Sequence, residues 1–328
     1  MKERWGVRTL SLLGYAACSI CLACASSPEV IRPTTRHPAT APAIDADPWA
    51  LLPRGAVAWG DLDASAAFSS SFAEEARVLW LDHLPVSRAS TIDPTKDVDR
   101  IRLGAYATVG ADFAMIVSGR FNPKQIADAI SKEPLARHGK EVLRTHFAGF
   151  DVFVLDAVAL VPLTERTLVL GTEIGVRRVL ERVESGRLVR PLPAWFEKML
   201  ETSAPLTLGV DLDAQPVPAM VRTRLSFLEG LRAGRLLGNF ESPGLNLAGS
   251  LTYDRPDTAT RAAHDIEAQA AALDQYAVLM SVLRIPRPLR RVRAQAVGQD
   301  AQVAVEVEGR AIAMLLSRFQ ELTSEMFE

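Results

Sequence analysis

The chain has 328 residues and a mass of 35.7 kDa, with 48% apolar, 23% charged and 6% aromatic residues. These proportions are ordinary for a folded globular chain, so they exclude a collagen-like repeat, a long coiled coil and wholesale disorder. The formal net charge of −2 argues against a protein that binds nucleic acid through many phosphate contacts. We therefore expect no nucleic-acid partner.

An export signal is predicted at the N-terminus. The basic residues Lys2, Arg4 and Arg8 precede an apolar run from Leu10 to Ala23. A helix needs about 20 apolar residues to cross a bilayer. This run is shorter, and small residues follow it directly, which is typical of a cleaved signal peptide. We take residues 1–24 as that signal and predict export to the cell envelope.

The three cysteines, Cys18, Cys21 and Cys24, all lie in this segment. The run C-L-A-C-A-S-S around Cys24 resembles the lipobox of bacterial lipoproteins, in which the signal is cut before the cysteine and the thiol is acylated. Cys21 departs from that pattern, which prefers Leu, Val or Ile. Two alternatives remain, namely cleavage after Ala25 and a Cys24 that merely packs in the apolar run. The resemblance implies a lipid anchor at Cys24, a membrane partner and, with no Asp at the next position, the outer membrane.

Residues 25–48 are rich in Pro, Ala and Thr without a hydrophobic period. Such a segment cannot pack and tends toward extended geometry. It predicts a disordered tether between the anchor and a folded body.

The body carries an internal repeat. The tetrapeptide D-L-D-A occurs at Asp61–Ala64 and again at Asp211–Ala214, a spacing of 150 residues. In both copies an alternating pattern predicts a strand, followed by a helix near 65–83 and near 217–236. Further strands, each leading through a proline into a helix, are predicted at 114–119 and at 245–253.

Each half then closes with a hairpin and a helix. The hairpins are predicted at 158–170 and at 292–307, and the apolar positions after each follow the helical spacing i, i+3, i+4, i+7. The first half has an extra hairpin at 141–155. We predict an α+β fold of two divergent, similar modules, 49–190 and 191–328, with mostly antiparallel sheet and helices packed on one face.

Paired aspartates are the first candidate site. Asp61 and Asp63 lie two apart on a predicted strand and so face the same way, as do Asp211 and Asp213. Such pairs could hold Ca²⁺ with added oxygen ligands or act as an acid–base pair. We favour a structural role, because the second aspartate of each pair stands where a strand ends and a helix begins, the N-cap position.

Arginines gather near the C-terminus, at Arg284, Arg287, Arg290, Arg291 and Arg293. Guanidinium groups bind carboxylates and phosphates, so the cluster could hold an anionic lipid headgroup or an acidic partner. The alternative is a solvated loop and edge strand whose charges block unwanted pairing.

Other motifs offer little chemistry. The histidines show no zinc-ligand spacing, and no nucleophile elbow or phosphate-binding loop occurs. His138 and His146 flank a predicted hairpin strand and are expected at the surface. Gly230, Gly234 and Gly238 predict a helix that packs closely on its own sheet. We expect no catalytic residues, no cofactor and no enzymatic activity.

The whole pattern resembles uncharacterised bacterial envelope lipoproteins with a signal, a Pro/Ala/Thr tether and a duplicated α+β body. The resemblance rests on L-L-P-R-G-A-V-A-W-G-D-L-D-A, F-A-M-I-V-S-G-R-F-N-P-K-Q-I-A-D-A-I and R-T-L-V-L-G-T-E-I-G-V-R-R-V-L-E-R-V. It covers residues 1–190 and, more loosely, the second half, and it implies localisation and architecture only. The leading hypothesis is an envelope-anchored binding or scaffolding protein. The alternatives are a carrier or sensor of a lipid-like ligand, held between sheet and helices, and a hydrolase with a dispersed site.

Overall fold

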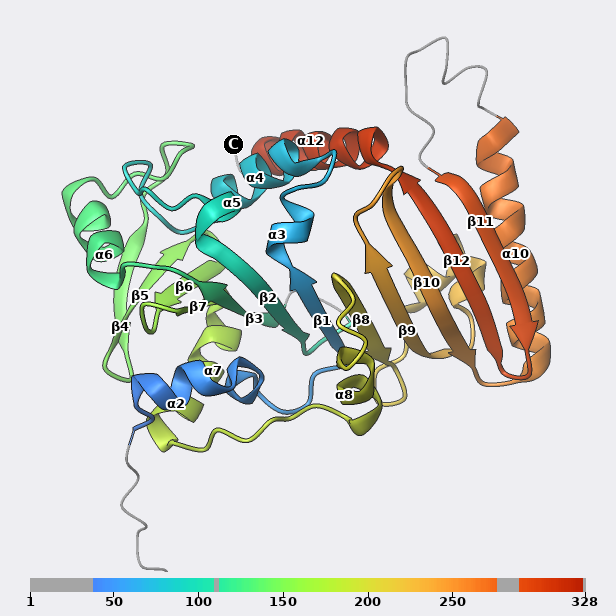
Figure 1. Ribbon diagram of the computed structural model, residues 1–328, viewed down its shortest axis with the longest axis horizontal. Helices are drawn as coiled ribbons and strands as arrows, with labels where there is room; N and C mark the ends of the chain where they lie inside the picture. The colour runs from blue at the N-terminus through green and yellow to red at the C-terminus, as the bar shows by residue number, and fades with distance from the viewer. Residues whose placement is uncertain (1–37, 109–111, 276–288, 327–328) are drawn as a thin grey trace, which may run out of the picture. The chain divides into compact units, whose positions relative to one another are not determined.

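The computed structural model describes residues 38–108, 112–275 and 289–326 (Figure 1). The predicted signal, Cys24 and most of the predicted tether lie outside these residues. No helix within the described ranges is both long and apolar enough to cross a membrane.

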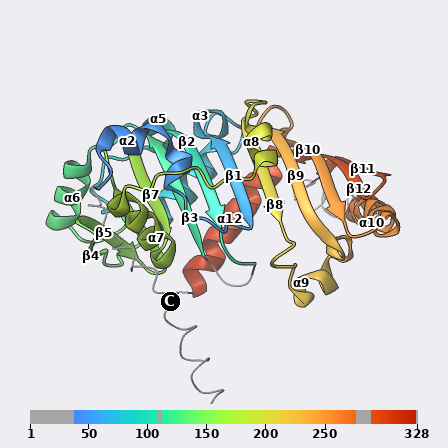
Figure 2. The same ribbon diagram turned by 90° about the horizontal axis from the view of Figure 1, so that it is seen from below.

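Twelve strands form one sheet in the order β11-β12-β10-β9-β8-β1-β2-β3-β7-β6-β5-β4. Every neighbouring pair is antiparallel. Figure 2 shows the strands from the β4 edge to the β11 edge. The first-half strands are β1 (Ala58–Asp63), β2 (Val98–Ala105), β3 (Phe113–Gly119), β4 (Leu143–Phe147), β5 (Phe150–Leu155), β6 (Val158–Pro162) and β7 (Thr167–Thr172). The second-half strands are β8 (Leu206–Asp211), β9 (Leu231–Asn239), β10 (Gly244–Tyr253), β11 (Leu289–Val297) and β12 (Asp300–Glu308).

The strand order repeats outward from the centre. From the β1–β8 pair it runs β2, β3, β7, β6 on one side and β9, β10, β12, β11 on the other. The first half adds the hairpin β4–β5. Trp59 and Gly209, which are equivalent in the sequence repeat, are register partners across the centre. The α+β fold with two divergent, similar modules is thereby confirmed.

Helices follow equivalent strands in the two halves. The first-half helices are α2 (Ala41–Ala46), the 3₁₀ turn η1 (Pro48–Leu51), α3 (Ala64–Ala67), α4 (Ala73–His83), α5 (Pro94–Asp97), α6 (Pro123–Lys132) and α7 (Glu173–Ser185). The second-half helices are α8 (Ala194–Leu200), α9 (Ala219–Arg224), η2 (Ser226–Leu228), α10 (Pro256–Gln275) and α12 (Gly309–Met326). The helix α12 returns to the first half and contacts α4 (Figure 1).

Helices cover both faces of the first-half strands rather than one. We call the face that carries Trp59 and Ile116 the front face, and the face that carries Val117 and Leu168 the back face. On the front face η1, α7 and α8 bury one cluster, and on the back face α4 and α6 bury another. Both faces are covered because strands such as β7, T-L-V-L-G-T, carry apolar side chains in succession, and β7 is buried at all six positions. Such continuous burial is typical of a strand with both faces covered.

The last part of the predicted tether is folded. Residues 41–46 form α2, and residues 48–51 form η1. Ile44, Trp49 and Leu51 are buried in the front cluster. Proline in the first helical turn lacks only a donor that would be unpaired there, so Pro42 and Pro48 begin these helices instead of excluding them.

The predicted helix near 217–236 is also wrong. This segment contains α9, η2 and most of β9. Four-residue spacing places side chains on one face of a strand as well as of a helix. A Cβ added to Gly234 would lie 2.9 Å from Val210 Cγ1, and one at Gly238 would lie 2.8 Å from Leu247 Cδ2. These glycines therefore make room for neighbouring strands' side chains, not for a helix neighbour. The predicted helix at 65–83 is divided into α3 and α4.

Candidate functional site

An apolar pocket, which we call the α10 pocket, lies between the back face of the second-half strands and α10. Its volume is about 350 Å³, within the roughly 300–1,000 Å³ of small-molecule sites. Twelve described residues line the pocket, and eleven of them are apolar. They come from η2 (Phe227, Leu228), β9 (Leu236), β10 (Leu247, Leu251), α10 (Ile266, Ala270), β11 (Leu289, Val292) and β12 (Val303, Val305), and the twelfth is Gln269.

Alternation along the strands produces the pocket floor. On β12 the residues Val303 and Val305 point to the back face, while the alternate residues Gln302 and Ala304 are exposed. Val305 is the register partner of Leu247 on β10 and of Val292 on β11. Paired residues share a face of the sheet. Three neighbouring strands therefore present one continuous apolar surface to α10.

The pocket opens where the packing of α10 changes along its length. Near its start the small residues Ala259, Ala262 and Ala263 are buried against Tyr253. A turn later, Ile266 faces the pocket and is only half-buried. The equivalent first-half strand, β7, is buried at every position, whereas β12 is largely half-buried or exposed. The second half thus leaves apolar surface that its own helix does not cover.

Polar groups border the α10 pocket on the helix side. Gln269 Nε2 lies 3.5 Å from Ser226 Oγ, which donates a hydrogen bond to Asp265 Oδ2 at 2.9 Å. A pocket with apolar walls and few polar groups suits a ligand with an apolar chain and a polar end.

The first aspartate pair has a structural role in this geometry. Asp61 is 2% exposed, and its two oxygens accept bonds from Arg100 Nε at 2.8 Å and Nη2 at 2.5 Å. This bond holds the pKa of Arg100 above its ordinary value. Asp63 Oδ1 accepts a hydrogen bond from Ala66 N at 2.9 Å at the start of α3. The predicted N-cap is therefore confirmed for Asp63.

The second aspartate pair, Asp211 and Asp213, makes different contacts. Asp211 Oδ1 accepts from the backbone N–H of Asp213 at 3.2 Å, and Asp213 lies 2.9 Å from Arg232 Nη1. No helix follows directly, since α9 begins at Ala219 after Pro218, so the predicted cap at Asp213 is wrong. Across the described ranges, no three His, Cys, Asp or Glu side chains are grouped so that they could hold a metal ion.

The predicted arginine cluster is only partly within the structure. Arg284 and Arg287 lie outside the described residues, whereas Arg290, Arg291 and Arg293 lie on β11, an edge strand. Arg290 and Arg291 form ion pairs with Glu308 and Glu306 of β12, at 3.7 Å and 3.2 Å. Two charges of the cluster are thus offset by carboxylates on the neighbouring strand.

The two candidate histidines lie apart, and each is beside a carboxylate. His138 Nε2 lies 3.7 Å from Asp82 Oδ2, and His146 Nδ1 lies 3.6 Å from Asp151 Oδ1. Both imidazoles are exposed, at 45% and 65%. Within the described part of the chain, neither forms a hydrogen bond with a serine or threonine hydroxyl.

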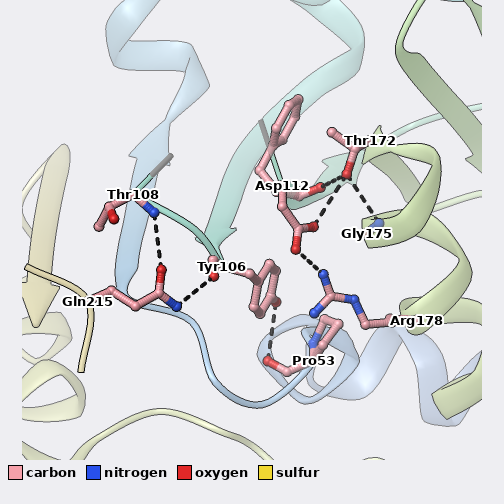
Figure 3. Close-up of polar contacts among 9 residues, drawn as sticks. Pro53, Tyr106, Thr108, Asp112, Thr172, Gly175, Arg178 and Gln215 are labelled. Atoms are coloured by element: carbon pink, nitrogen blue, oxygen red, sulfur yellow. Dashed lines mark hydrogen bonds and ion pairs between the residues drawn. The ribbon is translucent and has the colours of Figure 1, made fainter. Parts of the chain in front are cut away.

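A polar cluster that no sequence motif indicated joins the two halves (Figure 3). The Arg178 guanidinium forms an ion pair with Asp112 and lies over the Tyr106 ring at 4.6 Å. From the second half, Gln215 donates to Tyr106 O at 3.1 Å and accepts from Thr108 N at 3.2 Å. Burial raises the pKa of the Tyr106 phenol. These contacts hold the end of β2 in place, which gives the cluster a structural role.

Comparison with solved structures identifies the fold. Two crystal forms of TP0453 each superpose with a TM-score of 0.50, at 11% and 14% sequence identity. Each alignment covers 83% of this chain, and 97% and 96% of the respective TP0453 chains. At such identity the likeness establishes a shared α+β fold. No protein-family model matches the sequence, and no curated protein matches it.

Proposed function

We propose that this is an exported, lipid-anchored envelope protein without enzymatic activity, which binds the apolar chain of a lipid-like ligand in the α10 pocket. One observation carries the proposal. Large apolar side chains of four strands and α10 surround about 350 Å³ of space without closing it. Leaving such side chains unpacked costs stability. A ligand that fills the space would recover part of that cost.

The lining specifies the ligand class. Gln269 is the sole polar side chain among the described lining residues, so the described walls of the pocket favour contact with an apolar chain. Each methylene transferred from water contributes about 0.8 kcal/mol. Affinity should therefore depend mainly on chain length, with Gln269 and Ser226 left to contact a polar end at the border.

Displacement of a fluorescent apolar probe by saturated fatty acids of increasing length tests this function. We expect affinity to rise about fourfold per added methylene until the pocket is full. Ala270→Phe fills part of the pocket and should weaken binding at least tenfold. Ala268→Phe, on the exposed side of the same helix, is the matched control and should bind as the wild type does. Binding without chain-length dependence, or equal binding by both variants, would contradict the proposal.

The anchor is a separate part of the proposal and rests on the sequence around Cys24. The intact mass of the protein from its native membrane fraction tests it. We expect a chain that begins at Cys24 and carries acyl mass. A chain that begins at Ser26 without lipid would contradict anchoring and leave ligand binding to be judged by the displacement assay.

A further inference from the structure

A second pocket lies in the first half, on the front face of the sheet. Its volume is about 350 Å³, and α2, η1, β2, β3 and the β6–β7 turn line it. Two arginines, Arg102 and Arg166, are among its lining residues, with the carboxylates of Asp45 and Asp99. We call it the Arg102 pocket. The α10 pocket is on the opposite face and in the other half, so the two sites are independent.

Arg102 forms no ion pair with any carboxylate in the described part of the chain. Its register partner on β1 is Asp61, but Arg100 occupies both oxygens of that side chain. Arg102 Nη1 donates instead to Ser118 Oγ at 2.8 Å, and its buried Nε has no hydrogen-bond partner in the described chain. Burial lowers the pKa of this guanidinium, and Asp61 offsets part of that effect. A desolvated cation without a full set of acceptors is unfavourable for folding alone.

Two carboxylates near the Arg102 pocket, Asp45 and Asp47, accept hydrogen bonds from residues other than Arg102. Asp45 Oδ1 accepts hydrogen bonds from the hydroxyls of Thr164 and Thr167, at 2.6 Å and 2.7 Å. Asp47, next to the pocket, accepts two bonds from Arg190, both at 3.0 Å. Asp99 is exposed at the rim.

Arg166 is the second cation of the Arg102 pocket. It stands on the β6–β7 turn, is exposed, and forms no ion pair with any described residue. The backbone fixes its position, because Gly119 N donates to Arg166 O at 3.0 Å. The pocket thus has one desolvated arginine in its wall and, on its rim, one arginine without an ion pair among the described residues.

We propose that the Arg102 pocket binds a small oxyanion, the phosphate or carboxylate group of a soluble molecule. Two guanidinium groups from separate elements supply the donors that such groups prefer. The anion would form an ion pair with Arg102, which has none among the described residues. This inference does not depend on the proposed apolar ligand.

Isothermal titration of the full chain with sodium phosphate, and separately with sodium acetate, tests the site at constant ionic strength. We expect saturable binding of either anion. Comparison of the two titrations shows whether the pocket prefers a phosphate or a carboxylate group. We expect Arg102→Gln to weaken binding at least tenfold and Arg166→Gln at least threefold. Arg187→Gln removes an exposed arginine outside the pocket and should leave binding unchanged.

Absence of saturable binding of both anions to the wild type would overturn the proposal. Equal affinity of Arg166→Gln and Arg187→Gln would also overturn it. That comparison remains decisive if Arg102→Gln fails to fold, because Arg166 and Arg187 are both exposed. A loss of fatty-acid binding in Ala270→Phe bears only on the α10 pocket and not on this site.

Discussion

Replacing Asp61 by alanine tests the structural account of the first aspartate pair. Asp61 is 2% exposed and accepts two bonds from Arg100, whose side chain is 34% exposed. Removing one partner of a buried ion pair costs about 3–5 kcal/mol. Because Arg100 can be partly rehydrated, we place the loss at the lower end, about 3 kcal/mol in the free energy of unfolding. The equivalent Asp211 accepts one backbone N–H and is only half-buried, so Asp211→Ala should cost about 1 kcal/mol or less.

Urea unfolding of the two variants measures the difference directly. The repeat supplies the matched control, since the two residues occupy equivalent positions of the repeat in the central strands β1 and β8. We expect a lower midpoint for Asp61→Ala with an unchanged denaturant slope. Equal losses in the two variants would refute the reasoning. So would a loss below about 1 kcal/mol for Asp61→Ala, because the buried bidentate pair would then contribute no more than a surface one.

The remaining predictions concern buried phenols and edge charges. Burial raises the pKa of Tyr106 and of Tyr253 well above the ordinary value. The pKa of tyrosine in an unfolded chain is about 10. The neutral phenols therefore make their full contribution to the free energy of unfolding below that pH, and this contribution is lost as the pH rises through their raised folded-state pKa values. Phenolate absorbance and urea unfolding at increasing pH check this, and ordinary titration of both phenols in the folded protein would contradict it. On β11, the double substitution Arg290→Gln/Arg291→Gln breaks two exposed ion pairs and should lower stability by less than about 1 kcal/mol per pair. It should also leave binding to anionic vesicles unchanged, and loss of sedimentation with such vesicles would show that these arginines hold an anionic surface.

Much of the fold could be predicted because the repeat carries local signals. The helix α6 begins at Asn122-Pro123, where Asn122 Oδ1 accepts from Gln125 N, and α7 shows an apolar stripe with Val176 and Val179 buried. The hairpin predicted at 292–307 corresponds to β11 and β12. These elements were predictable because each needs only neighbours within a few residues in the sequence.

Other features depend on contacts that are remote in sequence. Glycine at position 209 is needed because Phe196 and Trp195 of α8 lie within 2.6–2.7 Å of where its Cβ would be. The strand β9 was mistaken for a helix because residues four apart share a face in both structures. Asp61 and Arg100, and likewise Asp112 and Arg178, are brought together only by strand pairing and helix packing. No periodicity in the sequence reports such pairs.

The α10 pocket was anticipated only as a condition of one hypothesis. The sequence predicted the hairpin that contains β12 but not that α10 would leave part of the apolar face of β12 open. That depends on the change from the buried alanines near the start of α10 to the half-buried Ile266, and on the placement of η2 beside the helix.

Methyl NMR of the protein during titration with a medium-chain fatty acid tests the central claim most directly. The account predicts saturable shifts of the methyl groups of Ile266, Leu251 and Val303, which line the α10 pocket, and none at the exposed Leu143. If the pocket methyls do not move, or if Leu143 shifts as much as they do, the protein does not hold an apolar chain in this pocket.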